Sequence, residues 1–482
     1  MNRHSQMKER SDPMREFVNA GPADEIKPHW TLDRRSFLKG GALAIASAAL
    51  PFKALIGRKA GAIELPYSPD YGPLKPTKDE TTGLPLLNLP EGFRYLSFGW
   101  TGDTMSDGIV TPSLHDGMAV CAVILNRLIL VRNHEQGDAK GSFAPPKVTY
   151  DSVATGGTTN LTFDLHHGKW LESWASLGGT VRNCAGGPTP WGSWITCEET
   201  AVDPSTHPEF TKTHGWVFEV PAFRRAQPHP LKAMGRFVHE AIAVDPVTGI
   251  VYETEDRGAS GFYRFLPRKR GVLKAGGQLQ MLKVESMNQA DLTGGFANGT
   301  KWHVEWVDID DPTQLHTPGA TDGAGVYQQG LAKGGATFSR GEGCWYGAGV
   351  IYFTSTDGGA AEKGQVWCYD PRRERLTMLF ESPGASVLDN PDNIAWSPRG
   401  SILLCEDGSE TPQKLRGLTP DGEIFPFAEN QIVLNGEVNG ISGDFRDKEW
   451  AGATFYNEWL FVNIQTPGVT FAITGPWDNG AL

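Results

Sequence analysis

Short runs of strand-forming residues recur along the chain, and each run ends at an acidic or amide residue. A turn residue comes first, then a few apolar or β-branched residues, then a small polar residue before the carboxylate or amide. The final polar residues of these runs are Glu135, Glu199, Asp256, Asp357, Asp407 and Gln465. Similar chemistry at the end of each run indicates an internal repeat.

Several runs follow a second strand-like segment across a tight turn. The stretches AIAVDPVTGIVYETED (241–256) and NIAWSPRGSILLCED (393–407) are typical of antiparallel hairpins. Repeats of roughly 40–60 residues built from such strands are typical of β-propellers. We therefore predict an all-β fold, a six-bladed β-propeller with loop insertions, one of them the basic, glycine-rich segment 267–280. A two-sheet sandwich, the main alternative, does not explain why the strand ends repeat the same chemistry.

The N-terminal region has the pattern of an export signal. Arg34 and Arg35 precede an uncharged run of small and apolar residues, 40–52, which is too short to cross a bilayer as a stable helix. The arrangement resembles the twin-arginine signal, whose pathway carries folded proteins. We expect residues 1–60 to hold this signal peptide and residues 61–482 to form the propeller, with the mature protein periplasmic or extracellular and without stable membrane insertion.

The charge is unevenly distributed along the chain. Residues 1–60 contain 11 Lys and Arg and 6 Asp and Glu, a net formal charge of +5. The whole chain has a formal charge of −12, so residues 61–482 carry −17. Such an acidic body disfavours nucleic acid as a partner and suits cation binding where carboxylates converge. Among the six cysteines, those in apolar runs are predicted to be free and buried: Cys121, Cys197, Cys368 and Cys405.

A propeller would bring the polar strand ends together, because equivalent loops of all blades meet on one face around the axis. Taken singly, each carboxylate is more often a solvated surface residue. Converged carboxylates repel one another unless cations or protons neutralise them, and hard divalent cations such as calcium prefer oxygen ligands. The repeated strand ends therefore predict a cation site.

Two further features refine this prediction. Cys184 lies in a glycine- and proline-rich turn, and its thiolate suits iron, zinc or copper better than calcium. Arg340 lies two residues from Glu342, which puts both side chains on one side of an extended strand and suits phosphate binding beside a metal. An ordinary surface ion pair is the simpler reading of that second feature. Glu198, adjacent to Glu199, is expected to point away from the axis.

Five stretches resemble the PhoX-type alkaline phosphatase family, as does the twin-arginine signal. They are NCAGGPTPWGSWITCEE (183–199), HEAIAVDPVTGIVYETED (239–256), FSRGEG (338–343), NPDNIAWSPRGSILLCEDG (390–408) and FVNIQTPG (461–468). The resemblance implies a six-bladed propeller that binds iron and calcium together and hydrolyses phosphate monoesters.

Residue roles follow from the resemblance, position by position. Asn183 and Arg340 match phosphate-contacting positions, and Cys184 matches the iron-ligating cysteine. The other implied metal ligands are Glu199, Glu240, Glu342, Asp392, Glu406 and Asp407.

We therefore expect an exported, monomeric enzyme that acts on a small-molecule phosphoester and has the twin-arginine export machinery as a partner. Two other classes remain open from the residues alone. One is a calcium-dependent propeller hydrolase such as a lactonase or phosphotriesterase, which would not need the thiolate of Cys184. The other is a non-catalytic metal-binding propeller, which would leave Arg340 unexplained.

Overall fold

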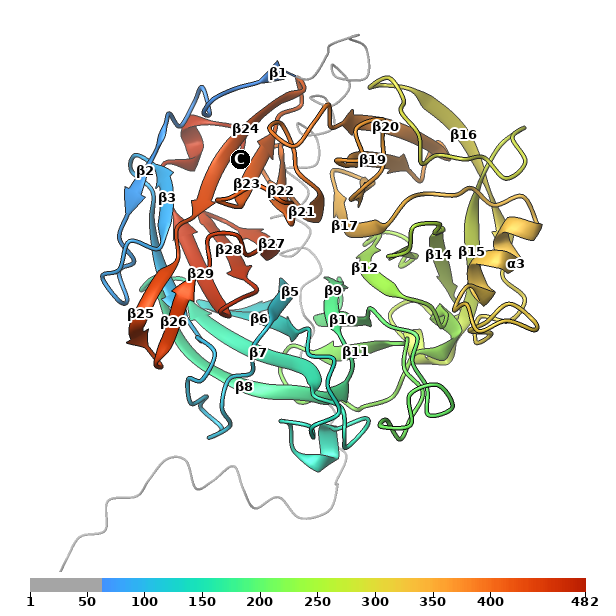
Figure 1. Cartoon of the computed structure of the whole chain (residues 1–482), viewed down its shortest axis with the longest axis horizontal. Helices are drawn as coiled ribbons and strands as arrows, with labels where there is room; N and C mark the ends of the chain where they lie inside the picture. The colour runs from blue at the N-terminus through green and yellow to red at the C-terminus, as the bar shows by residue number, and fades with distance from the viewer. Residues whose placement is uncertain (1–62) are drawn as a thin grey trace, which may run out of the picture. The chain divides into compact units, whose positions relative to one another are not determined.

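The computed structural model describes residues 63–482, so the predicted signal peptide lies outside the described residues. The regular secondary structure of the described residues is almost entirely β-strand, and the strands are arranged around a central axis (Figure 1). None of the described helices is long and apolar enough to span a membrane. The all-β propeller prediction is therefore confirmed.

Six innermost strands form a closed ring in which each lies beside the next (Figure 1). They are β5 (His115–Ile124), β9 (Asn183–Pro188), β12 (His239–Val244), β17 (Gly341–Gly347), β21 (Pro391–Trp396) and β27 (Trp450–Tyr456). Each pairs antiparallel with the strand that follows it: β6 (Arg127–His134), β10 (Ser193–Glu198), β13 (Val251–Glu255), β18 (Val350–Ser355), β22 (Ile402–Glu406) and β28 (Trp459–Ile464). These twelve strands contain the repeat found in the sequence.

Outer strands complete the blades. They are β7 (Gly156–Asp164), β8 (Lys169–Thr180), β11 (Val217–Pro221), β14 (Phe262–Pro267), β15 (Gly277–Val284), β19 (Gln365–Asp370), β20 (Arg375–Glu381), β23 (Lys414–Leu418), β24 (Glu423–Asn430) and β29 (Val469–Thr474). The early strand β4 (Arg94–Phe98) pairs with β29, so the last blade joins the two ends of the propeller chain. This pairing closes the ring, with β4 as the outermost strand of the last blade.

The remaining elements lie at the rim. β1 (Ile63–Glu64), β2 (Leu74–Thr77) and β3 (Leu87–Pro90) extend the sheet of β24, and β25 (Val433–Val438) pairs with β26 (Ile441–Asp444) as a separate ribbon. Short helices connect other strands: η2 (Pro146–Val148), η3 (Lys232–Met234), η4 (Leu273–Ala275) and α3 (Gly325–Ala332). A last short helix, η5 (Trp477–Asn479), follows β29.

The longest interval between repeats has a different origin from the one expected. Segment 267–280 forms the turn from β14 to β15 and the start of β15, so it belongs to the blade. The additional chain follows it, in residues 285–340. This part contains α3 and β16 (Lys301–Asp308), which pairs with both β15 and β20 and so merges two blades into one nine-stranded sheet.

Aromatic side chains fill the space between neighbouring blades. Phe262 of β14 stacks on Phe353 of β18, with ring centroids 4.1 Å apart and planes 10° from parallel. Trp194, Trp367 and Trp450 are each no more than 1% exposed. A fully buried side chain of this size contributes about 1.5–3 kcal/mol or more. All six cysteines, including Cys184, are free and buried, as predicted for the four in apolar runs.

Candidate metal centre

A polar cavity of about 100 Å³ lies at the end of the ring where the innermost strands begin. Nine carboxylates, two arginines, one thiol and one amide line it. These residues are Asp116, Glu135, Arg182, Cys184, Glu199, Glu240, Asp256, Arg340, Glu342, Asp392, Asp407, Glu449 and Gln465. The predicted convergence of polar strand ends therefore takes place.

A β-bulge recurs near the start of every innermost strand. Between two paired positions the innermost strand advances three residues while its partner advances two. The first residue inside each bulge is Asp116, Cys184, Glu240, Glu342, Asp392 or Gly452. Bulges re-aim side chains at strand ends, and all but Gly452 line the cavity. The β-bulge that is repeated around the ring thus directs five candidate ligands into the cavity.

The partner strands supply a second set of side chains from the residue just after each strand. Glu135, Glu199, Asp256 and Asp407 occupy this place and line the cavity. In the β17–β18 blade the equivalent residue is Thr356. Asp357 lies one position further along and accepts a hydrogen bond from Ser339 Oγ at 2.6 Å. Five of the six predicted strand ends therefore meet, and Asp357 does not join them.

The β27–β28 blade contributes by a different route. A side chain at Gly452 would collide with the Asp116 carbonyl oxygen, 2.6 Å from the position of its Cβ, and the residue has a φ of +62°. Glu449 and Gln465 extend the paired strands and reach the cavity instead, with Gln465 Nε2 donating to Glu449. The glycine allows strands β5 and β27 to approach closely while the next residues outward provide the polar groups.

Three groups of side chains have ligand atoms within 4.8 Å of one another. Cys184, Glu199 and Glu240 form the first, and Glu240, Glu342 and Asp392 form the second, so that Glu240 belongs to both. Asp116, Glu135 and Glu449 form the third. The first group mixes one soft donor with hard oxygens, whereas the other two offer only oxygens. This donor set fits a transition metal beside divalent cations such as calcium.

The electrostatics of the carboxylates agree with cation binding. Burial, reinforced by neighbouring carboxylates, raises the pKa of Asp116, Glu240, Glu342 and Glu449 well above the ordinary value. The same causes raise the pKa of Glu199 to about 10. A cluster of this kind holds protons at neutral pH unless cations replace them. Metal binding would therefore relieve the repulsion that the fold imposes.

Cys184 is buried directly at this cluster. Its Sγ lies 3.4 Å from the His239 carbonyl oxygen and 3.6 Å from that of Glu240. Burial raises the pKa of the thiol, and the negative charges of Glu240 and Glu199 raise it further. Only a nearby cation would favour the thiolate here, so the geometry suits a metal ligand better than a free nucleophile.

Each of the two cavity arginines is held by two carboxylates. Arg340 Nε and Nη2 donate to the two oxygens of Asp256 at 2.8 and 3.0 Å, and Nη2 also donates to Glu342 at 2.7 Å. Arg182 pairs with Glu135 and Glu199. Arg340 therefore lies beside Glu342, as the spacing of the two residues predicts, and Glu342 is a candidate metal ligand.

Asn183 does not line the cavity. Its side-chain oxygen accepts a hydrogen bond from Thr180 Oγ1 at 2.5 Å, and its Nδ2 donates to Thr196 Oγ1 at 2.9 Å. Asn183 is the paired residue just before the bulge, and its side chain points away from the cavity, to Thr196 of its own blade and to Thr180 of the preceding blade. The expectation that Asn183 faces the axis is corrected on this geometry. Its amide is placed to fix the strand that carries Cys184.

Glu406 also departs from the expectation. Its Oε1 accepts from Arg416 Nε at 2.9 Å and from the Asp389 backbone N–H at 3.1 Å, inside the blade, and Glu406 is absent from the cavity lining. Asp407 is adjacent on the extended chain and faces the other way, toward the cavity. Only the second residue of this acidic pair reaches the site.

Glu198 and Glu199 also face opposite sides of the extended chain, as the sequence predicts. Glu198 is fully buried and accepts from His214 Nδ1 at 2.6 Å and from the backbone N–H groups of Val181, Gly215 and Trp216. Its carboxylate ties together the loops that flank Glu199.

Several cavity residues were not among the predicted ligands. Asp116, Arg182 and Glu449 were missed altogether, while Glu135, Asp256 and Gln465 were identified as strand ends but not assigned to the site. Comparison of each innermost strand from its first paired residue would have found Asp116, because it aligns with Cys184 and Glu240. Glu449 offers no such signal, since it lies outside the register of its blade.

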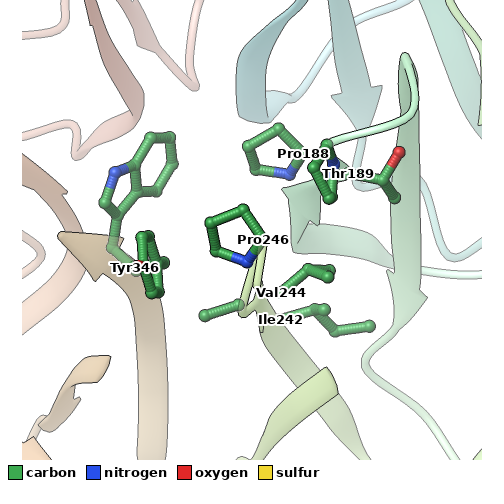
Figure 2. A pocket seen from close by; sticks show the side chains of 9 residues that line it. Pro188, Thr189, Ile242, Val244, Pro246 and Tyr346 are labelled. Carbon is green, nitrogen blue, oxygen red and sulfur yellow. The ribbon is translucent and has the colours of Figure 1, made fainter. Parts of the chain in front are cut away.

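A second pocket lies at the opposite ends of β9, β12 and β17 (Figure 2). Pro188, Ile242, Val244, Pro246 and Tyr346 are among the residues that line its volume of about 180 Å³. It is the larger of the two, but none of its lining residues is acidic, basic or a cysteine. The chemistry of the molecule is therefore concentrated at the carboxylate end of the ring.

Removal of metal should destabilise the protein, and more so at higher pH. The pKa of Asp392 is raised to about 7 and that of Glu199 to about 10, mainly by burial. Groups with raised pKa values stabilise the fold while protonated, and this stability is lost as pH rises through those values. We expect excess chelator to lower the melting temperature by about 5 °C or more at pH 9, and by less at pH 6. Calorimetry with and without calcium measures this, and identical curves in chelator and calcium at both pH values would contradict it.

Comparisons with known proteins identify the family and support the fold. The family model for the alkaline phosphatase PhoX matches residues 69–173 and 164–468. Among solved structures, the chain is similar to Pseudomonas fluorescens PhoX in complex with vanadate, a transition state analogue. The TM-score is 0.59 and the identity 17%, over 88% of this chain and 99% of that one.

Two other solved structures show weaker similarity. They are a gluconolactonase from Xanthomonas campestris, with a TM-score of 0.41 and 11% identity over 84% of this chain and 98% of that one, and the WD40 propeller domain of Doa1, with a TM-score of 0.37 and 9% identity over 80% and 99%. A comparison with curated proteins finds no match. The PhoX family model spans most of the chain, and the chain therefore belongs to the PhoX alkaline phosphatase family of phosphoester hydrolases.

Proposed function

We propose that this protein is an exported phosphatase that hydrolyses phosphate monoesters at an iron and calcium centre in the carboxylate cavity. The observation that carries the proposal is the mixed donor set, in which Cys184 lies with Glu199 and Glu240, and Glu240 also belongs to a group that offers only oxygens. A purely calcium-dependent lactonase would have no use for a buried thiol at that place. Membership of the PhoX family supports the same reaction class.

The residues of the cavity would hold two kinds of metal ion. Cys184, Glu199 and Glu240 would hold iron, and the two groups that offer only oxygens would hold calcium. When bound, these cations would supply Lewis acidity to the phosphoryl oxygens and to the attacking oxygen. Asp407 lines the same cavity and adds a further oxygen donor.

Arg340 would bind a non-bridging phosphoryl oxygen. Its guanidinium is held in place by Asp256 and Glu342, while about 40% of the side chain stays exposed at the cavity. A guanidinium fixed in this way can donate to an oxyanion without first being ordered, which favours the charge that develops as the ester bond breaks. Asn183 would act indirectly, by fixing the bulge that aims Cys184.

The reaction class is tested with the purified, metal-loaded protein. We expect hydrolysis of p-nitrophenyl phosphate to exceed that of a lactone and of a phosphotriester, and to be lost in chelator. Activity on the lactone or the triester alone would replace this proposal with one of the two alternative hydrolases. No activity on any of them would leave a metal-binding propeller without the proposed catalysis.

We further propose that the twin-arginine sequence at Arg34 and Arg35 directs export and is removed with roughly the first 50–60 residues. The double replacement Arg34→Lys with Arg35→Lys should keep the protein in the cytoplasm, as fractionation followed by immunoblotting would measure. Normal secretion of this double variant would contradict a twin-arginine route.

A further inference from the structure

Arg182 occupies the same place in its blade that Arg340 occupies two blades further around the ring. Arg182 immediately precedes Asn183, the paired residue before the bulge of β9, and Arg340 immediately precedes Gly341, the paired residue before the bulge of β17. Both arginines have a positive φ, 49° and 42°. Leu114 and Asn390 adopt the same conformation at this place in two other blades, with φ of 53° and 51°. The conformation therefore belongs to the repeat, and it marks the two arginines as structurally equivalent.

The two guanidinium groups also use the same atoms for equivalent contacts to the preceding blade. Arg182 Nε and Nη2 lie 3.1 and 3.0 Å from Oε1 of Glu135, the strand-end carboxylate of the preceding blade, and Nη2 also contacts Glu199 of its own blade. Arg340 likewise directs Nε and Nη2 to the strand-end carboxylate of its preceding blade, Asp256. The contacts within the two blades differ, because Nη2 of Arg340 reaches the bulge residue Glu342, whereas Nη2 of Arg182 reaches a strand-end residue.

Each arginine therefore has one guanidinium nitrogen that is available to bind a ligand. Nη1 of Arg182 and Nη1 of Arg340 have no hydrogen-bond partner among residues 63–482, although both side chains line the cavity and about half of the Arg182 side chain is exposed there. The carboxylates fix the plane of each guanidinium, so the free Nη1 groups are oriented before any ligand binds.

We propose that Arg182 and Arg340 together donate hydrogen bonds to the terminal phosphoryl group of the substrate, and that Arg182 makes the site selective for phosphate monoesters over diesters. This inference rests on the proposed function of the cavity. A monoester dianion presents one more unsubstituted oxygen and one more negative charge than a diester does. Two fixed guanidiniums match that group, whereas a diester can satisfy only part of the same set of donors.

The test compares Arg182→Gln, Arg182→Lys and a matched control, Arg446→Gln. Arg446 forks onto Asp444 with Nε and Nη2 and has a similarly exposed side chain, but it does not line the cavity. Three quantities are measured for each metal-loaded protein: metal content, the dissociation constant of vanadate, and the ratio of kcat/KM for p-nitrophenyl phosphate to that for bis(p-nitrophenyl) phosphate.

Loss of a charge-assisted hydrogen bond lowers affinity by about 10–100-fold. We expect Arg182→Gln to weaken vanadate binding and to reduce the monoester-to-diester ratio by that factor with its metals retained, while Arg446→Gln matches the wild type. Arg182→Lys keeps the charge but loses the fork, and we expect an intermediate ratio.

Unchanged vanadate binding and an unchanged ratio in Arg182→Gln would overturn the inference and leave the proposed phosphatase function intact. If Arg182→Gln loses its metals, Arg182→Lys decides: an intermediate ratio with metals retained supports the inference, and either metal loss or wild-type behaviour overturns it. A wild-type protein that neither hydrolyses the two esters nor binds vanadate would refute the proposed function itself, and this inference with it.

Discussion

Cys184→Ser is expected to remove the iron and to reduce phosphate monoester hydrolysis by about 100-fold or more. The Sγ atom lies within 4.8 Å of ligand oxygens of Glu199 and Glu240, so it can share a cation with both. A serine hydroxyl rarely ionises and is a much poorer ligand, and losses in metal affinity of 10–100-fold follow even from changes outside the ligand sphere. Metal analysis and steady-state kinetics on the purified variant measure both effects.

Cys197→Ser is the matched control for this experiment. Cys197 is also fully buried, and it lies on β10, the strand that pairs with the strand of Cys184, but it does not line the cavity. Its replacement should cost some stability through lost packing and leave metal content and turnover close to the wild type. If Cys184→Ser keeps its metals and full activity, the thiol has no part in the site.

Glu406→Ala is expected to lose stability and Asp407→Asn to lose bound metal, although the two residues are adjacent. Glu406 pairs with Arg416 inside the blade, where the two side chains are 1% and 3% exposed. Removal of one member of a buried pair leaves an uncompensated charge and costs about 3–5 kcal/mol. Glu406→Ala should therefore unfold at a much lower denaturant concentration than the wild type, with both proteins measured in chelator.

Asp407→Asn should instead retain most of the stability of the metal-free fold and bind less metal, because Asp407 faces the cavity. A double variant, Glu406→Leu with Arg416→Leu, controls for the first effect, since removal of both charges should recover much of the lost stability. Metal loss in Glu406→Ala protein that is still folded, or normal metal content in Asp407→Asn, would contradict the opposite orientations of the two side chains.

The sequence predicts the propeller and the existence of the site, because the same strand-and-carboxylate pattern returns in each blade. It also predicts the parity at Glu198 and Glu199, since adjacent residues of an extended strand face opposite ways. The same rule applied to Glu406 and Asp407 would have placed Glu406 inside the blade, but the two residues were assigned to the site together. The resemblance to a family motif does not distinguish neighbours within that motif.

Other parts of the site depend on backbone geometry that a single sequence does not show. The bulge at the start of β9 aims Cys184 at the cavity and leaves Asn183 pointing away from it, and the bulge of β27 places Gly452 where other blades have a cavity-lining side chain. Arg182 was missed because its equivalence to Arg340 follows from the register of the two strands. The motifs around them, RNC and RGE, share only the arginine and its distance of two residues from a cavity side chain.

Elemental analysis of the protein purified from its own exported pool tests most directly whether cations occupy the carboxylate cavity. We expect iron and calcium bound in stoichiometric amounts, with iron reduced in Cys184→Ser and unchanged in Cys197→Ser. Full phosphatase activity in protein that contains neither metal would contradict this expectation.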